Sequence, residues 1–194
     1  MKLRVDLRIN SRQEWIDAVM ADFDSFLQDH ANCERKASAM AMSFVAKFPD
    51  RLEIIPELID TAIEELDHFK AVYEIMQTRG IKLPKEMGPD PYVNKLIEHC
   101  RSGREDRFMD RLLLASLVET RGAERFRLVY ENLDDKALKE FYHNLWASEA
   151  KHGETFIRMA LNYFDESDVG RRMDELNLME SEVIDSLPIK AALH

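Results

Sequence analysis

The chain of 194 residues is 45% hydrophobic and carries a formal net charge of -10. This length suits a single domain with one hydrophobic core, spanning residues 1–194, and the acidic balance excludes sequence-independent nucleic-acid binding over the whole surface. With only two cysteines and no apolar stretch near the ~20 residues that a membrane span needs, we expect a cytoplasmic protein without a disulfide framework or a membrane segment.

Helical patterns follow one another along the chain. Only six glycines and six prolines interrupt them, which favours an all-α fold. A capping-box pattern from Ser11 to Glu14 predicts a short first helix that ends near residue 20. A core bundle between about residues 22 and 164 then contains the long helices, which we expect at 22–48, 50–80, 105–132 and 134–164.

The connection between the second and third long helices is itself long. Residues 81–104 are interrupted by prolines and glycines, with a short helix expected over 90–100. Two helical hairpins joined by one long crossover form a ferritin-like four-helix bundle. A further helix over about 167–186 is expected to pack outside that bundle.

The same set of charged side chains occurs twice on these helices. Glu34 precedes a Glu-x-x-His pair, Glu65 and His68, and Glu119 precedes a second pair, Glu149 and His152. Residues three apart on a helix lie on one side of it, so both members of a pair can hold one metal ion. Four carboxylates and two imidazoles on four helices are typical of a two-iron centre within a bundle, and oxygen and nitrogen ligands favour iron or manganese over structural zinc.

Other residues on these helices are expected to have roles other than metal binding. The second long helix should turn an apolar face that includes Ile59, Ala62, Leu66 and Val72 toward the core, near Glu65. A third Glu-x-x-His pair, Glu140 and His143, falls on the opposite helix face from Glu149, and we interpret it as facing solvent. Cys33 and Cys100 are expected to be small buried side chains.

Small residues follow each lone glutamate by one helical turn: Ala37 and Ser38 after Glu34, and Gly122 and Ala123 after Glu119. Glycine within a helix costs about 1 kcal/mol relative to alanine. Gly122 therefore indicates either close helix packing or space that is kept open beside the metals for dioxygen or substrate.

Any contact with RNA requires a local basic patch on this acidic protein. The best candidate is a cluster of arginines at the start of the third long helix, with lysines of the preceding loop: Arg101, Arg104, Arg107, Arg111, Lys82 and Lys85. Glu105, Asp106 and Asp110 interleave with the arginines, so an ordinary solvated helix start is the alternative interpretation.

Several runs around the ligands resemble one family in particular. They are Asn32–Ser38, Glu64–Phe69, Met76–Ile81, Val118–Phe126 and Ser148–His152. These runs are similar to those of the bacterial tRNA 2-methylthio-N6-isopentenyladenosine hydroxylases, and the resemblance covers about residues 14–165. The chain departs from the family at Gly122-Ala123, where Ser-Cys is typical, and at Gly153, where an aromatic residue is common.

The resemblance implies a ferritin-like fold and hydroxylation of the isopentenyl group of the hypermodified adenosine in tRNA. It implies two iron ions, with dioxygen as co-substrate and electrons from an external donor. Glu34 and Glu119 would be terminal ligands, Glu65 and Glu149 would bridge the irons, and His68 and His152 would each bind one iron. The catalytic role of these side chains would be exercised through the metal pair.

Two other classes of function use comparable sequences. A ferritin-like bundle also serves iron oxidation and storage or peroxide scavenging, and the fold alone does not separate these. A cage-sized assembly would favour storage, whereas the expected monomer or dimer favours the hydroxylase. A metal-free interaction protein would require the repeated ligand set to be a coincidence.

Overall fold

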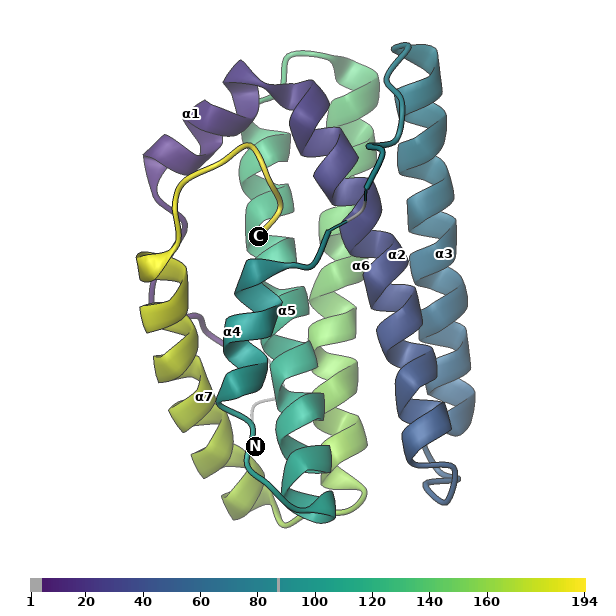
Figure 1. The fold of residues 1–194 in the computed structure, drawn as a ribbon, viewed down its shortest axis with the longest axis vertical. Coiled ribbons are helices and arrows are strands. Elements are labelled where there is room, and N and C mark those ends of the chain that lie inside the picture. The colour runs from purple at the N-terminus through teal and green to yellow at the C-terminus, as the bar shows by residue number, and fades with distance from the viewer. Residues whose placement is uncertain (1–4, 87) are drawn as a thin grey trace. The chain divides into compact units, whose positions relative to one another are not determined.

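The computed structural model describes residues 5–86 and 88–194, and these residues form helices joined by turns and loops, with no strand among them (Figure 1). The helices in the described residues are α1 (Gln13–Ala21), α2 (Phe23–Lys47), α3 (Ile55–Thr78), α4 (Pro91–Glu98), α5 (Arg104–Asn132), α6 (Lys136–Leu161) and α7 (Glu166–Ser186). The predicted all-α class is therefore confirmed. None of the described helices combines the length and the hydropathy required to span a lipid bilayer.

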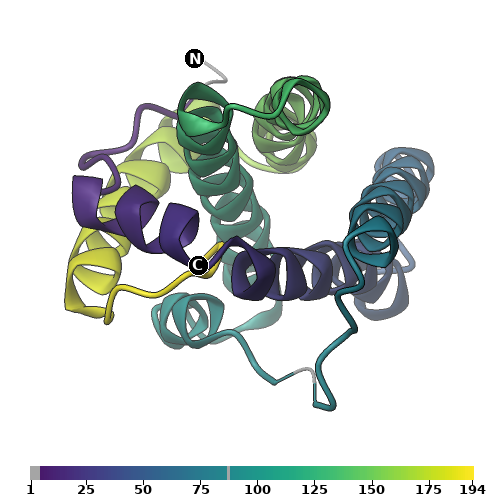
Figure 2. The same ribbon diagram turned by 90° about the horizontal axis from the view of Figure 1, so that it is seen from above.

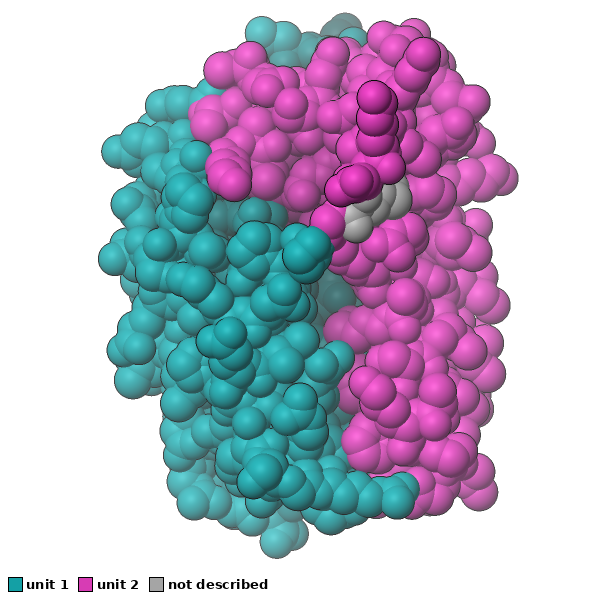
Figure 3. All heavy atoms as spheres, viewed as in Figure 1, with its two compact units in different colours: residues 1–17, 89–189, 194 teal, residues 18–88, 190–193 magenta. Residues whose placement is uncertain are grey.

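The chain divides into two compact units (Figure 3). Unit 1 comprises residues 1–17, 89–189 and 194 and contains α4 to α7, whereas unit 2 comprises residues 18–88 and 190–193 and contains α2 and α3. Each unit thus holds one long helical hairpin, as the sequence predicts. The assignment of residues 1–194 to a single domain stays a prediction.

Unit 2 is built on the α2–α3 hairpin, whose helices run side by side in Figures 1 and 2. The side chain of Asp22 caps α2 by accepting a hydrogen bond from the backbone N–H of Ser25 at 3.2 Å. Gly80 follows the last turn of α3 with φ +71°, a conformation that glycine adopts without steric cost. Between the helices, the Ser38 hydroxyl donates to the backbone carbonyl of Ala62 at 2.7 Å.

Two details of α3 differ from the sequence prediction. The helix begins at Ile55 rather than near residue 50, because Pro56 occupies its first turn, where a proline needs no hydrogen-bond partner for its nitrogen. Ile59 and Leu66, which were expected to face the core, are 40% and 54% exposed. Ala62 and Val72 are buried as expected, together with Leu58, Glu65 and Met76.

Unit 1 is built on the α5–α6 hairpin, with α4 and α7 packed against it. The side chain of Asp135 caps α6 through the N–H of Leu138 at 3.0 Å, and that of Asp90 caps α4 through the N–H groups of Tyr92 and Val93. Helix α7 contacts α4, α5 and α6 and buries Val169 and Leu176 among others. The C-terminal helix is therefore a component of this unit's core.

The predicted capping box at Ser11 is wrong. The Ser11 hydroxyl donates to Glu124 Oε2 at 2.7 Å, and the Ser11 N–H donates to Glu124 Oε1 at 2.9 Å. A carboxylate on α5 thus takes the place that Glu14 was expected to fill, because Glu124 accepts from both the N–H and the hydroxyl of Ser11 and leaves Ser11 no further donor. The first helix then starts at Gln13.

A buried ionic network fixes α5 within unit 1. The Arg121 guanidinium is fully buried and donates to both carboxylate oxygens of Glu180 on α7, at 2.9 and 3.0 Å, and to the carbonyl of Ile9. The Tyr92 hydroxyl donates to the same carboxylate at 2.9 Å, and burial together with the Glu180 charge raises the pKa of Tyr92. Because every partner is charged or hydrogen-bonded, the cost of burying these groups is offset.

Candidate metal centre

The predicted ligands lie on the long helices at the expected positions. Glu34 is on α2, Glu65 and His68 are on α3, Glu119 is on α5, and the pair Glu149 and His152 is on α6. All are buried except His68, whose side chain is 15% exposed. Carboxylates are seldom buried unless a cation or donors compensate them, so each unit carries an acidic cluster that requires a counter-charge.

In unit 2 the side chains of Glu34, Glu65 and His68 converge. His68 Nδ1 lies 3.4 Å from Glu65 Oε2 and 3.8 Å from Glu34 Oε2. The Glu-x-x-His spacing on α3 places the imidazole one turn beyond Glu65, and packing of α2 on α3 supplies Glu34. Two carboxylate oxygens and one imidazole nitrogen are thus directed at the same region.

His30 belongs to the same cluster and was missed at the level of sequence. It is fully buried on α2, and its Nε2 lies 2.6 Å from Glu34 Oε1. The available signal was the spacing: His30 precedes Glu34 by four residues, which places both on one helix face. His30 stands outside the repeated Glu-x-x-His pattern.

In unit 1 the pair on α6 repeats the geometry of α3. His152 Nδ1 lies 3.3 Å from Glu149 Oε2, and both side chains are buried. Glu119 is buried on α5, the partner of α6 in the hairpin. The Ser116 hydroxyl donates to the Gly153 carbonyl at 2.7 Å and joins the two helices one turn from these side chains.

The donor set fits iron. Each unit offers two carboxylates and one imidazole, the ligand types found in ferritin-like two-iron proteins. The cysteines Cys33 and Cys100 are not in disulfides, and burial raises the pKa of the Cys100 thiol, which disfavours the thiolate that binds metals. Glu140 and His143 are exposed, as the sequence predicts.

The glycines near the ligands have opposite surroundings. A Cβ atom built on Gly122 would meet no atom of the described residues within 4 Å, so this glycine leaves open space one turn beyond Glu119. A Cβ atom on Gly153 would lie 2.8 Å from Thr120 Oγ1, so that glycine is required by close packing. Of the two interpretations of Gly122, the geometry therefore favours open space.

Part of the arginine cluster forms ion pairs and hydrogen bonds within the protein. Arg101 donates to Asp110 at 2.7 Å and pairs with Asp106 at 2.9 Å. Arg104 and Arg107 have exposed side chains, and burial lowers the pKa of Arg111. The role of Arg101, Arg104, Arg107 and Arg111 in RNA binding stays a prediction, with Arg104 and Arg107 best placed to reach a ligand.

A cleft of about 520 Å³ lies in unit 1, where residues 5–10 approach the α5–α6 hairpin. Thr120, Arg127, Trp146 and Ala150 are among its lining residues. Trp146 lies three residues before Glu149, and Ala123, a further lining residue, lies four residues after Glu119, so each is one helical turn from a ligand position. The cleft is therefore lined in part by residues on the ligand side of α5 and α6.

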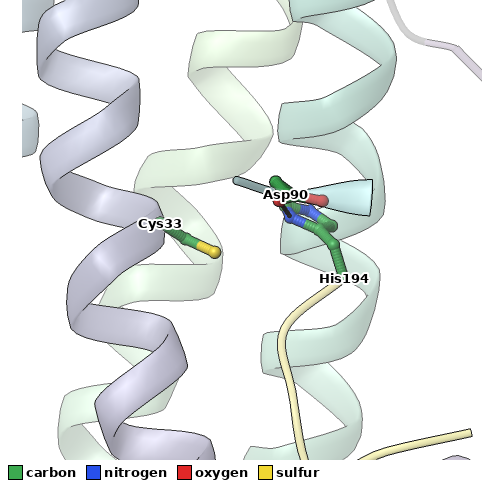
Figure 4. Close-up of side chains that lie close together, drawn as sticks. All are labelled: Cys33, Asp90 and His194. Carbon is green, nitrogen blue, oxygen red and sulfur yellow. Dashed lines mark hydrogen bonds and ion pairs between the residues drawn. The ribbon is translucent and has the colours of Figure 1, made fainter. Parts of the chain in front are cut away.

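A smaller polar contact involves the last residue of the chain. His194 Nδ1 lies 3.3 Å from Asp90 Oδ2, and the imidazole stacks on Tyr92 with ring centroids 4.8 Å apart, all within unit 1. The close-up in Figure 4 shows the carboxylate of Asp90 beside this imidazole. The same Asp90 side chain caps α4, so the contact fixes residue 194 at the start of that helix.

Comparison with known proteins agrees with these observations. The model of the family described as tRNA-(MS[2]IO[6]A)-hydroxylase (MiaE) matches residues 2–194. The tRNA 2-(methylsulfanyl)-N(6)-isopentenyladenosine(37) hydroxylase of Pseudomonas putida is 36% identical over 172 residues, which cover 89% of this chain and 83% of that protein. The protein of the same name from Salmonella typhimurium is 29% identical over 132 residues, 68% of this chain and 48% of that protein.

A solved structure is similar over almost the whole chain. It is "Protein 43 with aldehyde deformylating oxygenase activity from Synechococcus", with a TM-score of 0.91 and 29% sequence identity, and the match covers 97% of this chain and 94% of that one. The ferritin-like fold class expected from the sequence is thereby confirmed.

Proposed function

The chain belongs to the tRNA-(MS[2]IO[6]A)-hydroxylase (MiaE) family, and from this premise we propose that it hydroxylates the isopentenyl group of 2-methylthio-N6-isopentenyladenosine in tRNA. The family match over residues 2–194 is the observation that carries the proposal. The relative from Pseudomonas putida, named for this reaction, supports it, since the chain covers 83% of that protein. The protein is accordingly an oxygenase that modifies tRNA.

The proposal includes two iron ions per chain, one for each ligand set. Glu34, Glu65 and His68 would hold one ion, and Glu119, Glu149 and His152 the other. When bound, the iron would supply the activation of dioxygen: one oxygen atom enters a C–H bond of the isopentenyl group, and the other leaves as water with two electrons and two protons. The bridging roles of Glu65 and Glu149 remain predictions from the family resemblance.

The side chains of the protein prepare this chemistry in three ways. Buried carboxylates neutralise cations without competing water, and burial of Glu65 and Glu149 strengthens that attraction. The helices hold the imidazoles of His68 and His152 at a fixed distance from the neighbouring carboxylates. The open space beside Gly122, where a Cβ atom would meet nothing within 4 Å, is the proposed place for a reactant to approach.

Because the protein is acidic overall, we propose that a small basic patch binds the tRNA. The exposed guanidinium groups of Arg104 and Arg107 are the proposed phosphate contacts. A modified base in a single-stranded loop can be presented without opening a duplex, so a small patch suffices. We further propose that the protein acts in the cytoplasm as a monomer or dimer and receives electrons from an external donor protein.

The decisive experiment is mass spectrometry of nucleosides from isopentenylated tRNA that has been incubated with the iron-loaded protein, a reductant and dioxygen. The expected result is the gain of one oxygen atom on the hypermodified adenosine. Iron oxidation with an unchanged nucleoside, under conditions in which a known hydroxylase is active, would contradict the proposal and favour iron storage or peroxide scavenging. Omission of dioxygen is the control.

A further inference from the structure

The contact between His30 and Glu34 gives the two oxygens of one carboxylate different partners. Glu34 Oε1 lies 2.6 Å from His30 Nε2, whereas Glu34 Oε2 lies 3.8 Å from His68 Nδ1. As a metal ligand Glu34 would be an ionised carboxylate, which only accepts hydrogen bonds, so His30 Nε2 would be the donor in this contact. Oε1 is thereby engaged within α2, and Oε2 is directed at the ligand set.

Burial makes this contact rigid. His30 is 0% exposed and Glu34 is 3% exposed, so water does not replace the donor. The ring of His30 also packs on Phe26 one turn earlier, with ring centroids 5.8 Å apart. Charge-assisted hydrogen bonds in a dry environment are strong, and the helix fixes both side chains four residues apart.

The corresponding position in the other half of the chain has no donor. The residue four before Glu119 is Ala115, whose side chain is a methyl group. Four residues after the lone glutamates stand Ser38, whose hydroxyl donates to the Ala62 carbonyl, and Ala123, which has no hydroxyl. The two lone glutamates therefore differ in the side chains four residues before and after them, although the repeated ligand pattern makes them equivalent.

We propose that His30 is a positioning residue that fixes Glu34 so that only Oε2 is available to a metal ion. Glu34 then binds as a single-oxygen ligand. Ala115, four residues before Glu119, has no side-chain donor that could act on Glu119 in the same way, so the two ligand sets differ in this contact. The inference rests on the proposed function, because it assumes one ferrous ion in each set.

The test compares His30→Ala, which removes the donor, with His30→Gln, whose amide retains one. Ferrous iron bound per chain and its dissociation constant are measured anaerobically, without tRNA. Loss of a hydrogen bond to a metal ligand typically weakens metal binding about 10- to 100-fold. We expect that loss for one of the two ions in His30→Ala, and recovery of most of the affinity in His30→Gln.

Mössbauer spectra of the ferrous protein identify the affected ion. The doublet of the Glu34 set is assigned as the one lost in His68→Ala, and that of the other set as the one lost in His152→Ala. In His30→Gln the first doublet should shift and the second should not. His143→Ala, which removes an exposed imidazole, is the matched control and should change neither.

Three results would overturn the inference: wild-type iron affinity in both His30 variants, a shift confined to the doublet of the Glu119 set, or equal shifts of both doublets. If His30→Ala does not fold, as seen by circular dichroism, His30→Gln and the spectra still decide. The readouts are iron binding and spectroscopy, so failure of the inference is distinct from failure of the proposed function, which appears as an unmodified nucleoside in the wild-type protein.

Discussion

Thr120 Oγ1 lies 2.8 Å from the point where a Cβ atom would stand on Gly153. The same oxygen donates to the backbone carbonyl of Ser116 at 2.7 Å, and Ser116 in turn donates to the Gly153 carbonyl. Gly153 directly follows the ligand His152, so α5 and α6 touch closely beside the metal centre. The glycine at this place, where the family commonly has an aromatic residue, is thus explained by a threonine on the facing helix.

We predict that Gly153→Ala lowers the free energy of unfolding by about 1 kcal/mol, because the clash with Thr120 outweighs the helix preference of alanine. Urea denaturation monitored by circular dichroism measures the change. The loss should be smaller when Gly153→Ala is made in a Thr120→Ala background, where the contacting oxygen is absent. An equal loss in both backgrounds would contradict the steric explanation.

Gly122→Ala should have the opposite effect on stability. Its Cβ atom enters open space among the described residues, so the variant gains helix propensity, up to about 1 kcal/mol, without a clash. At the same time the methyl group narrows the space beside Glu119, and hydroxylation should slow while iron content stays at the wild-type level. A destabilised variant, or one with unchanged turnover, would show that this space is not used.

Acid stability should depend on Asp110. Burial alone would raise the pKa of this carboxyl, but hydrogen bonds from Arg172 and Arg101 outweigh it and hold the pKa below its ordinary value. A lowered pKa stabilises the fold above about pH 3.9, the ordinary value, and the contribution is lost as the pH falls through the lowered pKa.

Asp110→Asn should therefore lower the free energy of unfolding by about 3 kcal/mol at pH 7, since the buried Arg172 would lose one of its two carboxylate partners and keep only Glu175. The difference in free energy of unfolding between this variant and the wild type should shrink below about pH 4, because Asp110 of the wild type becomes protonated. Urea unfolding of both proteins at a series of pH values measures it. A difference that is constant with pH would refute the assignment of this acid sensitivity to Asp110.

Replacement of Arg104 and Arg107 by glutamate should weaken tRNA binding at least tenfold and reduce its salt dependence, because phosphate contacts release counterions. Arg101 is left intact, since its bonds to Asp110 would make its loss a structural defect. Affinity for isopentenylated tRNA at several salt concentrations is measured beside iron content.

The matched control replaces Lys136 and Lys151, which are exposed on α6 in the same unit, and changes the net charge equally. Equal weakening by both pairs would indicate a general electrostatic effect and would move the specific RNA site away from the arginine cluster.

The sequence predicts the features of this fold that depend on neighbours along a helix. The Glu-x-x-His pairs, the helix limits set by Asp135 and Gly80, and the outward orientation of Glu140 and His143 follow from turn chemistry and the helical period. Such patterns are local, and the structure repeats them with shifts of a few residues at the helix ends.

The features that escaped prediction depend on partners far along the chain or on residues outside the repeated Glu-x-x-His pattern. The capping box failed because Ser11 binds Glu124, 113 residues away, which no local rule anticipates. Ile59 and Leu66 are apolar yet exposed, since periodicity alone does not fix which edge of an apolar face is covered. The helical period places His30 on the same face as Glu34, four residues later, but His30 has no counterpart in the repeated ligand pattern.

The ion pair between Arg121 and Glu180 also bears on how insertions and deletions are tolerated. Arg121 stands two residues after Glu119, about 200° around the axis of α5, so the bond to α7 sets the rotation of the helix from the side away from the ligand. Inserting one residue between these positions would turn them by ~100° relative to each other. The segment 119–121 therefore admits no change of length.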